Sequence, residues 1–254
     1  MSVICDDALF QYALRLADDQ LILGHRLSEW CGHAPLLEED IALANIGLDL
    51  IGQARTLYAY AGAVEGNGRD EDALAYLRDA PHYRNLLLVE QPNGDFAVTI
   101  ARQFFYSAFM EPFWRALTAS RDETLAAVAA KAVKEVAYHV RHSAEWLIRL
   151  GDGTEESHAR AQDAVDDLWM YTGEMFEADA PTRDLIARGV AVDPAPIRPE
   201  WDRVVDAVLA EATLTRPAQT WMQTGGRAGR HSEHLGYLLA EMQFLQRAYP
   251  GAAW

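Results

Sequence analysis

Two segments of this 254-residue chain carry residue pairs whose spacing is that of iron ligands on a helix. The pairs are Asp49-x-x-Gly52 and Val136-x-x-His139. A carboxylate-bridged diiron site in a helical bundle requires a Glu from each of two helices and a Glu-x-x-His motif from each of the other two. Residues three apart lie on one helix face, so a complete motif offers two ligands to one cluster. Neither pair is complete, and the sequence therefore predicts that this chain does not hold two irons.

The composition argues against several classes of protein. The formal net charge of −16 disfavours nucleic acid or an anionic membrane as a main partner, because both are bound by basic surfaces. No apolar run approaches the roughly 18 residues that a membrane span needs. The N-terminus shows no export signal, so a cytoplasmic location is expected. The two cysteines, Cys5 and Cys31, have no CxxC spacing and predict no disulfide framework.

Apolar residues recur with the period of an α-helix along most of the chain, and half of all residues are apolar. Because no repeat, low-complexity tract or linker divides the sequence, we expect one all-α domain, 1–254. Its core bundle is predicted at about 6–178, with a C-terminal extension at about 179–254. Apolar residues wrap nearly the whole circumference of the second helix, which predicts a central position. The helices are predicted at about 6–31, 38–62, 71–78, 95–118, 120–150 and 154–178, with later ones beginning at about 200 and 231.

Helix ends and buried polar positions can also be predicted. The stretch from Ser120 to Glu123 has the form of a capping box and predicts the start of the fourth long helix. Gln20 lies on the apolar seam of the first helix, where a polar group without a partner would cost about 1–3 kcal/mol. Gln is a poor iron ligand, so a structural role is favoured for it. The adjacent acids Asp18 and Asp19 point to different helix faces and are not expected to act as a couple.

Two polar stripes follow otherwise apolar helices. Such a stripe faces a buried polar network or an interface between subunits, and ordinary solvent exposure is the alternative. We expect Asp49 and His139 to form a hydrogen bond or ion pair across the bundle centre, where metals would otherwise lie. The stripes comprise Asn45, Asp49, Gln53 and Thr56 on the second helix, and Lys131, Glu135, Tyr138, His139, His142 and Glu145 on the fourth.

The other histidine motifs give weak signals. The single complete Glu-x-x-His, from Glu155 to His158, falls in the first turn of a predicted helix and is expected at the surface. The His-x-x-His pairs that begin at His139 and His231 have a zinc-compatible spacing but no Cys pair or third ligand at a telling distance. No nucleophile elbow or dinucleotide fingerprint is present. The sequence therefore predicts neither catalytic residues nor a metal site.

Residues 224–231, Thr-Gly-Gly-Arg-Ala-Gly-Arg-His, form a glycine-rich, basic segment that leads into the last predicted helix. Backbone amides at a helix start, together with Arg227 and Arg230, could bind an anion. The segment is not a P-loop, because the Gly-Lys end of that motif is absent. The alternative is a flexible turn that contacts an acidic surface of a partner. A third interpretation, a CoA-thioester binding module, rests on this segment alone.

Five runs of sequence resemble one protein family closely. The family is that of the C subunits (PaaC) of bacterial phenylacetyl-CoA 1,2-epoxidases, and the resemblance covers essentially the whole chain. The runs are LSEWCGHAP at 27–35, ALANIGLDLIGQAR at 42–55, NLLLVEQPNG at 85–94, LGDGT at 150–154 and HLGYLLAEMQ at 234–243.

The resemblance implies an all-α, ferritin-like helical bundle with additional C-terminal helices. It also implies a non-catalytic structural subunit that binds no cofactor itself and supports a catalytic A subunit, which holds the diiron centre. The whole complex epoxidises phenylacetyl-CoA with O2 and with electrons that a reductase subunit takes from NADPH. Expected partners are the A subunit, in a heterodimer or higher oligomer, and the other epoxidase components. Without them, exposed apolar patches could pair this chain with itself as a homodimer.

Matching the chain to the family's diiron relatives assigns the former ligand positions. One position stays open between two residues of the third long helix, Ser107 and Glu111. Every departure implies lost metal binding. The rival class, a self-sufficient diiron oxygenase or an iron-binding ferritin-like protein, is disfavoured for that reason. The remaining former ligand positions are Gln20, Asp49, Gly52, Val136 and His139.

Overall fold

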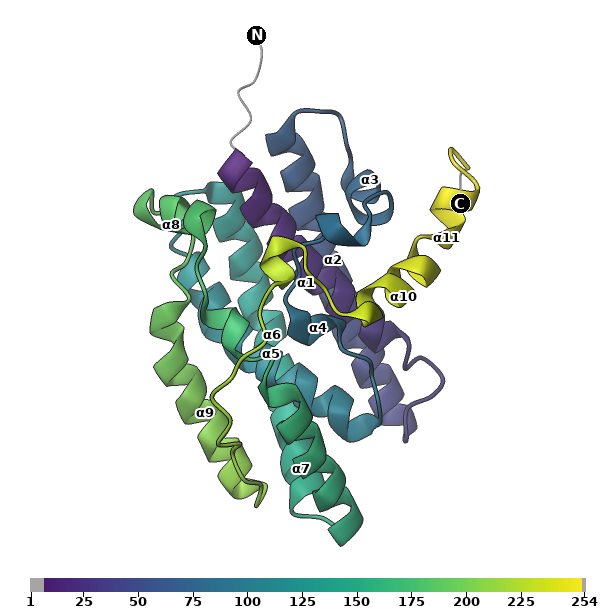
Figure 1. Cartoon of the computed structure of the whole chain (residues 1–254), viewed down its shortest axis with the longest axis vertical. Coiled ribbons are helices and arrows are strands. Elements are labelled where there is room, and N and C mark those ends of the chain that lie inside the picture. Colours follow the sequence, from purple (N-terminus) through teal and green to yellow (C-terminus); the bar gives the residue numbers. More distant parts are fainter. Residues whose placement is uncertain (1–6, 253–254) are drawn as a thin grey trace.

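The computed structural model describes residues 7–252, and every regular element in that range is a helix (Figure 1). The predicted all-α class is confirmed. The predicted bundle start at Asp6, like Cys5, lies outside the described residues. The bundle is built from four long helices, α1 (Asp7–Ser28), α2 (Leu37–Glu65), α5 (Phe96–Leu117) and α6 (Glu123–Gly151). Helix α1 packs along α2, α5 packs along α6, and α2 contacts α6.

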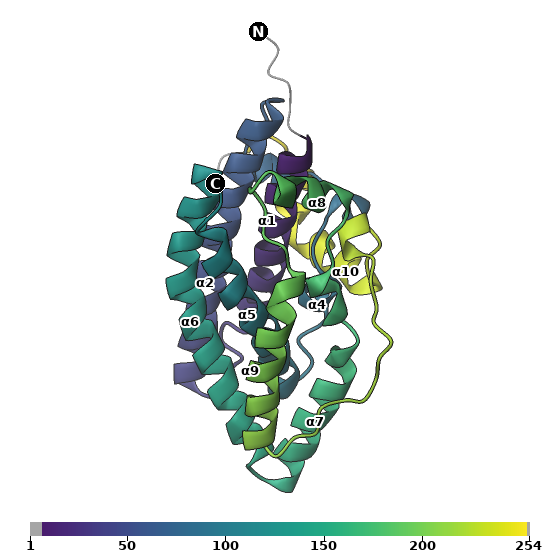
Figure 2. The same ribbon diagram turned by 90° about the vertical axis from the view of Figure 1, so that its left-hand side faces the viewer.

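Shorter helical elements surround the bundle: α3 (Glu71–Tyr76), η1 (Ala80–His82), α4 (Leu87–Glu90), α7 (Glu155–Trp169), η2 (Gly173–Phe176), α8 (Ala180–Ala187), η3 (Ala195–Ile197), α9 (Arg198–Glu211), η4 (Gly226–Ala228), α10 (Glu233–Met242) and α11 (Phe244–Ala248). Helices α7 and α9 pack on α5 and α6, and α8 packs on α1. Figure 2 shows α2 and α6 at one side of the molecule and α10 at the other. None of the helices within 7–252 is both long and apolar enough to cross a membrane.

Helix α5, rather than α2, occupies the middle of the molecule. It is buried along most of its length, and the ring of Phe105 lies 5.7 Å from that of Trp169 and 6.0 Å from that of Trp201, centroid to centroid. Helix α2 instead leaves Leu37 73% exposed and Leu48 66% exposed. The prediction of a central α2 was therefore wrong, because one side of its apolar circumference faces away from the bundle.

Side-chain caps set several helix ends. Asp122, not Ser120, caps α6, because the Asp122 carboxylate accepts a backbone amide while the Ser120 hydroxyl donates to the carbonyl of Val190, 2.6 Å away. The capping box predicted at Ser120 was wrong. Thr154 caps α7 through a capping box of its own, and α7 ends at Trp169 rather than near residue 178.

The residues after α7 fold back on the bundle. Arg15 of α1 donates to the Asp179 carboxylate and to the Thr182 hydroxyl, each at 2.8 Å. The Tyr12 hydroxyl accepts from the amide of Val192 at 3.2 Å. These contacts join residues far apart in the sequence, and they hold the predicted C-terminal extension against α1.

Candidate functional site at the bundle centre

A hydrogen bond between α2 and α6 stands where the sequence predicted one. His139 Nε2 lies 3.1 Å from Asp49 Oδ2, as expected. The His139 side chain is 1% exposed and that of Asp49 is 36% exposed, so the predicted contact forms, but it lies at the edge of the core rather than at the bundle centre. Helical spacing thus brings these two stripe residues together, and each is the hydrogen-bond partner of the other.

The remaining stripe residues divide between contact and solvent. Gln53 Nε2 donates to Glu135 Oε2 at 2.8 Å, and His142 Nε2 lies 2.7 Å from Glu39 Oε2. The two histidines of His139-x-x-His142 thus bind different carboxylates. The expected network is therefore present in part, and Asn45, Thr56, Lys131 and Glu145 line the outer side of the stripes.

Gln20 has the structural role predicted for it. Its Nε2 donates to the hydroxyl of Tyr106 at 2.8 Å, inside the core. Burial, with the charge of Asp19, raises the pKa of Tyr106 well above its ordinary value. The phenol therefore stays protonated and accepts from the amide. This neutral pair fills a position where a metal site would need a carboxylate.

The other positions that the sequence matched to ligands hold no free carboxylate or imidazole within the described residues. Val136 is a buried aliphatic residue, and a side chain at Gly52 would meet open space. Of the two third-helix alternatives, Ser107 is the buried one and lies 3.4 Å from the Ser143 hydroxyl of α6. Glu111 is bound by the guanidinium of Arg115 at 2.7 Å and 2.9 Å. These residues do not fit a diiron cluster.

Replacing Asp49 with Ala should lower the free energy of unfolding by about 1–2 kcal/mol, because the buried His139 loses its hydrogen-bond partner. Asn45, one turn earlier on α2, is exposed and serves as the matched control. Urea denaturation of both Ala variants measures the difference. Equal losses in the two variants would show that the Asp49 contact with His139 adds nothing to stability.

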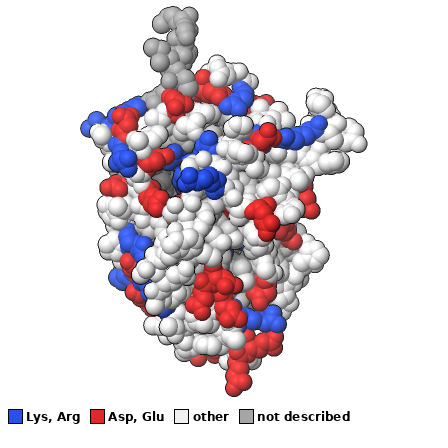
Figure 3. Space-filling view, in the orientation of Figure 1, with Lys and Arg blue, Asp and Glu red and all other residues white. Residues whose placement is uncertain are grey.

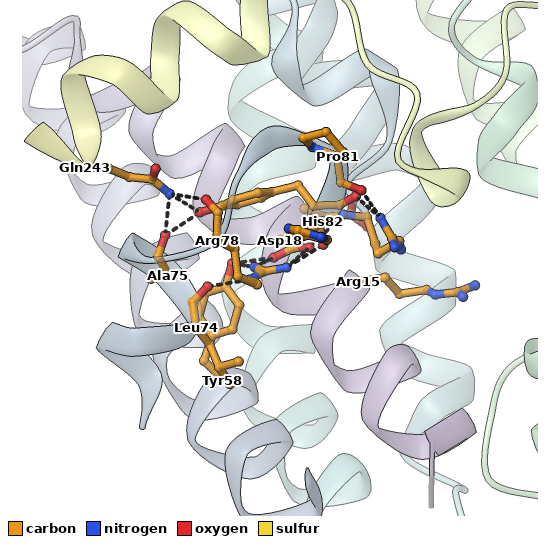
Figure 4. Close-up of polar contacts among 12 residues, drawn as sticks. Arg15, Asp18, Tyr58, Leu74, Ala75, Arg78, Pro81, His82 and Gln243 are labelled. Carbon is orange, nitrogen blue, oxygen red and sulfur yellow. Dashed lines mark hydrogen bonds and ion pairs between the residues drawn. The ribbon is translucent and has the colours of Figure 1, made fainter. Parts of the chain in front are cut away.

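A second polar cluster, beneath α3 and η1, was not predicted (Figure 4). Asp18 of α1 accepts from both terminal nitrogens of Arg78, and the Tyr58 hydroxyl donates to Asp18 Oδ1 at 2.5 Å. Burial and the charge of Asp18 raise the pKa of Tyr58 well above its ordinary value, so its hydroxyl keeps the proton it donates. The signal available in the sequence was a pair of acids inside an otherwise apolar helix.

Asp19 points to a different partner from Asp18, as helical geometry predicted. It binds the guanidinium of Arg227, with Nη2 to Oδ2 at 2.7 Å and Nη1 to Oδ1 at 3.1 Å. Burial raises the pKa of Asp19 to about 6, against the charge of Arg227. One of the two arginines of the glycine-rich segment is thus used to fix that segment to α1, and Arg230 is exposed.

The amides of the glycine-rich segment are also occupied. Glu174 Oε1 accepts from the amides of Gly225 at 2.9 Å and of Arg227 at 3.3 Å, while Oε2 accepts from Leu87 at 3.0 Å. Any Cβ at Gly226 would lie 2.2 Å from the carbonyl oxygen of Asn85, so only glycine fits there. The anion that this loop binds is a carboxylate of its own chain.

His231, which follows the segment, bridges two acceptors. Its Nδ1 lies 2.8 Å from Glu90 Oε2 and its Nε2 lies 3.0 Å from the carbonyl of Tyr83. Burial alone would lower the pKa of His231, but the hydrogen bond and charge of Glu90 outweigh it and raise the pKa above its usual value. His231 therefore joins the start of the last helical segment to Glu90 and to the chain at Tyr83.

This raised pKa predicts a pH dependence of stability. A raised His pKa contributes stability that is present below the unfolded-state pKa and is lost as pH rises through the folded-state pKa. For the unchanged chain, we expect the free energy of unfolding to fall as pH rises from the unfolded-state pKa of His231 through its folded-state pKa. In His231→Gln this fall should be smaller. Denaturant titrations at several pH values measure the two slopes. The same slope in both chains would exclude His231 as its source.

His158 and Glu155 separate from each other. His158 Nδ1 lies 2.7 Å from the carbonyl of Gly151 and is partly buried, whereas Glu155 is exposed. Across the described residues no group of three or more His, Cys, Asp or Glu side chains could hold a metal ion.

The helices and the polar contacts between them together define a class: an all-α, ferritin-like bundle whose long helices are joined by neutral and paired polar side chains. A family model for phenylacetic acid catabolic proteins matches residues 2–254, and the chain belongs to this family. It is 53% identical over 246 residues to the C subunit of 1,2-phenylacetyl-CoA epoxidase from Escherichia coli (strain K12). The match covers 97% of this chain and 99% of that relative, which confirms the resemblance seen in the sequence.

Proposed function

We propose that this chain is a non-catalytic structural subunit of a phenylacetyl-CoA epoxidase in cytoplasmic, aerobic phenylacetate degradation. It supports a catalytic A subunit that carries the diiron centre and that receives O2 and NADPH-derived electrons, the latter through a reductase component. The observation behind the proposal is the state of the former ligand positions. Gln20 is bonded to Tyr106, His139 is bonded to Asp49, and Val136 has no donor.

The alternative is a self-sufficient diiron oxygenase or an iron-binding ferritin-like protein. Such a protein needs carboxylates from four helices and two histidines around one centre. The positions matched to ligands carry the amide of Gln20, the hydroxyl of Ser107 and the pair of His139 with Asp49. The carboxylates of Glu39, Glu135 and Glu111 are each bound to a side chain of this chain. That set favours the structural role.

A row of exposed aliphatic side chains on α2 is the surface that we propose for the catalytic subunit. We define the α2 stripe as Leu37, Ile41, Leu48 and Ile51, which are 73%, 54%, 66% and 37% exposed. Their spacing places them along one side of the helix. Large contiguous apolar patches are unusual on monomers and mark contacts with other chains. The E. coli relative is named as a subunit of an enzyme. We therefore assign this row of side chains to a contact with another subunit of the same enzyme.

Replacing Leu48 with Glu should weaken binding of the catalytic subunit about tenfold or more, because an unpaired charge would be buried at the contact. The free energy of unfolding should hardly change, since Leu48 is exposed. Leu245→Glu, on α11, is the matched control. Biolayer interferometry with the immobilised A subunit measures both. Wild-type affinity in Leu48→Glu would remove the α2 stripe from the contact.

Iron analysis tests the structural role itself. We expect no iron in the lone chain and about two irons per pair in the complex with the catalytic subunit, as a helix-bundle diiron site requires. Two irons in the lone chain would establish the oxygenase alternative. Size-exclusion chromatography of the lone chain tests the homodimer, which should dissociate in Leu48→Glu if the α2 stripe forms it.

A further inference from the structure

A pocket of about 380 Å³ lies between the first half of α1 and the segment 69–84. The chain as a whole carries a net charge of −16, so a concentration of basic groups in one pocket is a local feature. An acidic side chain also lines it, Asp79, but this carboxylate is bound by Arg247 at 2.9 Å. The walls combine basic and apolar side chains, principally Arg69, Arg78, Arg84, His82, Phe10 and Leu77.

The three arginines differ in what they already bind. Arg78 is fully engaged, because it donates to Asp18, to the Tyr58 hydroxyl and to backbone carbonyls. It serves the fold. Arg84 has no carboxylate partner among the described residues. Its Nη1 donates to the carbonyls of Pro81 and Tyr83, each at 2.7 Å. Its Nε and Nη2 have no hydrogen-bond partner within residues 7–252.

Arg69 is intermediate between these two. Its Nε and Nη2 bind the Glu65 carboxylate, while Nη1 has no partner within residues 7–252. His82 is exposed at the pocket rim. Arg84 and Arg69 therefore both present hydrogen-bond donors without a described partner to the same pocket. The nearby acids Glu65 and Asp79 are already paired with arginines.

Arg84 is partly buried and lies near two other arginines, Arg78 and Arg15. Burial, together with the charges of Arg78 and Arg15, lowers the pKa of Arg84 despite the nearby Asp18. On the far side, Arg84 Nη1 lies 2.7 Å from the place that a Cβ on Gly229 would take. Figure 3 shows basic side chains gathered over η4, the element that Gly229 directly follows. An anion bound here would pair with the Nε and Nη2 donors of Arg84 that have no partner among the described residues.

We propose that this pocket, the Arg84 pocket, binds the phosphoryl group of a small organic phosphate monoester. Planar guanidinium donors match phosphate oxygens in pairs. Arg84 presents such a pair, Nε and Nη2, and Arg69 adds the single donor group Nη1. The pocket is larger than a single phosphate needs, and Phe10 and Leu77 supply an apolar wall for the organic part. The site is distinct from the glycine-rich segment, whose amides bind Glu174, and it is independent of the structural role proposed above.

Isothermal titration calorimetry of the full chain tests the proposal, with phenyl phosphate and inorganic phosphate as probes and phenol as the uncharged control. We expect phenyl phosphate to bind more tightly than inorganic phosphate, and phenol not to bind. Arg84→Ala should weaken phenyl phosphate binding about tenfold or more. The matched control is Arg203→Ala, an exposed arginine on α9, which should bind as the unchanged chain does.

Leu77→Glu provides a variant that leaves the hydrogen bonds of Arg84 in place. Leu77 is 59% exposed, so a carboxylate there should not disturb folding, yet it should repel the phosphoryl group and weaken binding. No binding of either probe at millimolar concentration would overturn the proposal. So would wild-type affinity in Leu77→Glu, or a loss confined to Arg230→Ala, because the latter would place the anion on the glycine-rich segment.

Discussion

Replacing Asp18 with Ala is expected to lower the free energy of unfolding by about 3–5 kcal/mol, because it leaves a buried guanidinium without its counter-charge. The Arg78 side chain is 5% exposed and that of Asp18 is fully buried. The same carboxylate accepts from the Tyr58 hydroxyl and, at 2.8 Å, from the backbone amide of Arg84. Its loss therefore leaves several buried donors unsatisfied at once. Urea denaturation followed by circular dichroism measures the change.

Two further variants separate charge from packing. Asp163 is an acid on α7 that lies outside the core, and Asp163→Ala should be nearly neutral. The double variant Asp18→Leu with Arg78→Met removes both charges and should recover much of the loss, since a buried ion pair can often be replaced by apolar residues. If Asp18→Ala were as mild as Asp163→Ala, the buried ion pair would not stabilise this fold.

Replacing Glu174 with Ala should cost about 3 kcal/mol or more and should release the glycine-rich segment from the bundle. Its carboxylate accepts three backbone amides, and each buried amide left unsatisfied costs about 1–3 kcal/mol. The segment would then lose its attachment to η2 and keep the ion pair between Arg227 and Asp19. We expect faster hydrogen exchange and faster proteolysis across residues 213–232.

Glu211, an exposed acid at the end of α9, provides the control, and Glu211→Ala should leave exchange in the segment unchanged. Glu174→Gln keeps one carbonyl oxygen and should lie between the two in stability. Unchanged protection of residues 213–232 in Glu174→Ala would mean that the Arg227 ion pair alone holds the segment, and Glu174 would then have no part in anchoring it.

Local patterns predicted much of the architecture. The helical period of apolar residues located the long helices within a few residues, because that period depends on neighbours three and four positions apart. The error at the start of α6 has a local cause as well. Both Ser120 and Asp122 can cap a helix, and the contact of Ser120 with Val190, 70 residues away, leaves the cap to Asp122.

In the candidate site, too, local patterns predicted some contacts and long-range packing decided the others. Spacing alone predicted that Asp49 and His139 would meet, and residue chemistry alone argued against metal at Gln20 and Val136. The sequence left Ser107 and Glu111 as alternatives, and the structure shows that Ser107 is buried while Glu111 binds Arg115. The buried ion pairs of Asp18 and Asp19 were not predicted, because their partners lie 60 and 208 residues away.

The sequence by itself determined the all-α class and the family, since each depends on residue type and on spacing along the chain. The incomplete set of iron ligands rests on the same patterns and stays a prediction. Tertiary structure decided which apolar face of α2 stays uncovered, which acid binds which arginine, and that the glycine-rich segment binds Glu174. These are contacts between distant parts of the chain. A helical pattern fixes which residues share a face, but the element that covers that face is chosen by packing of the whole molecule.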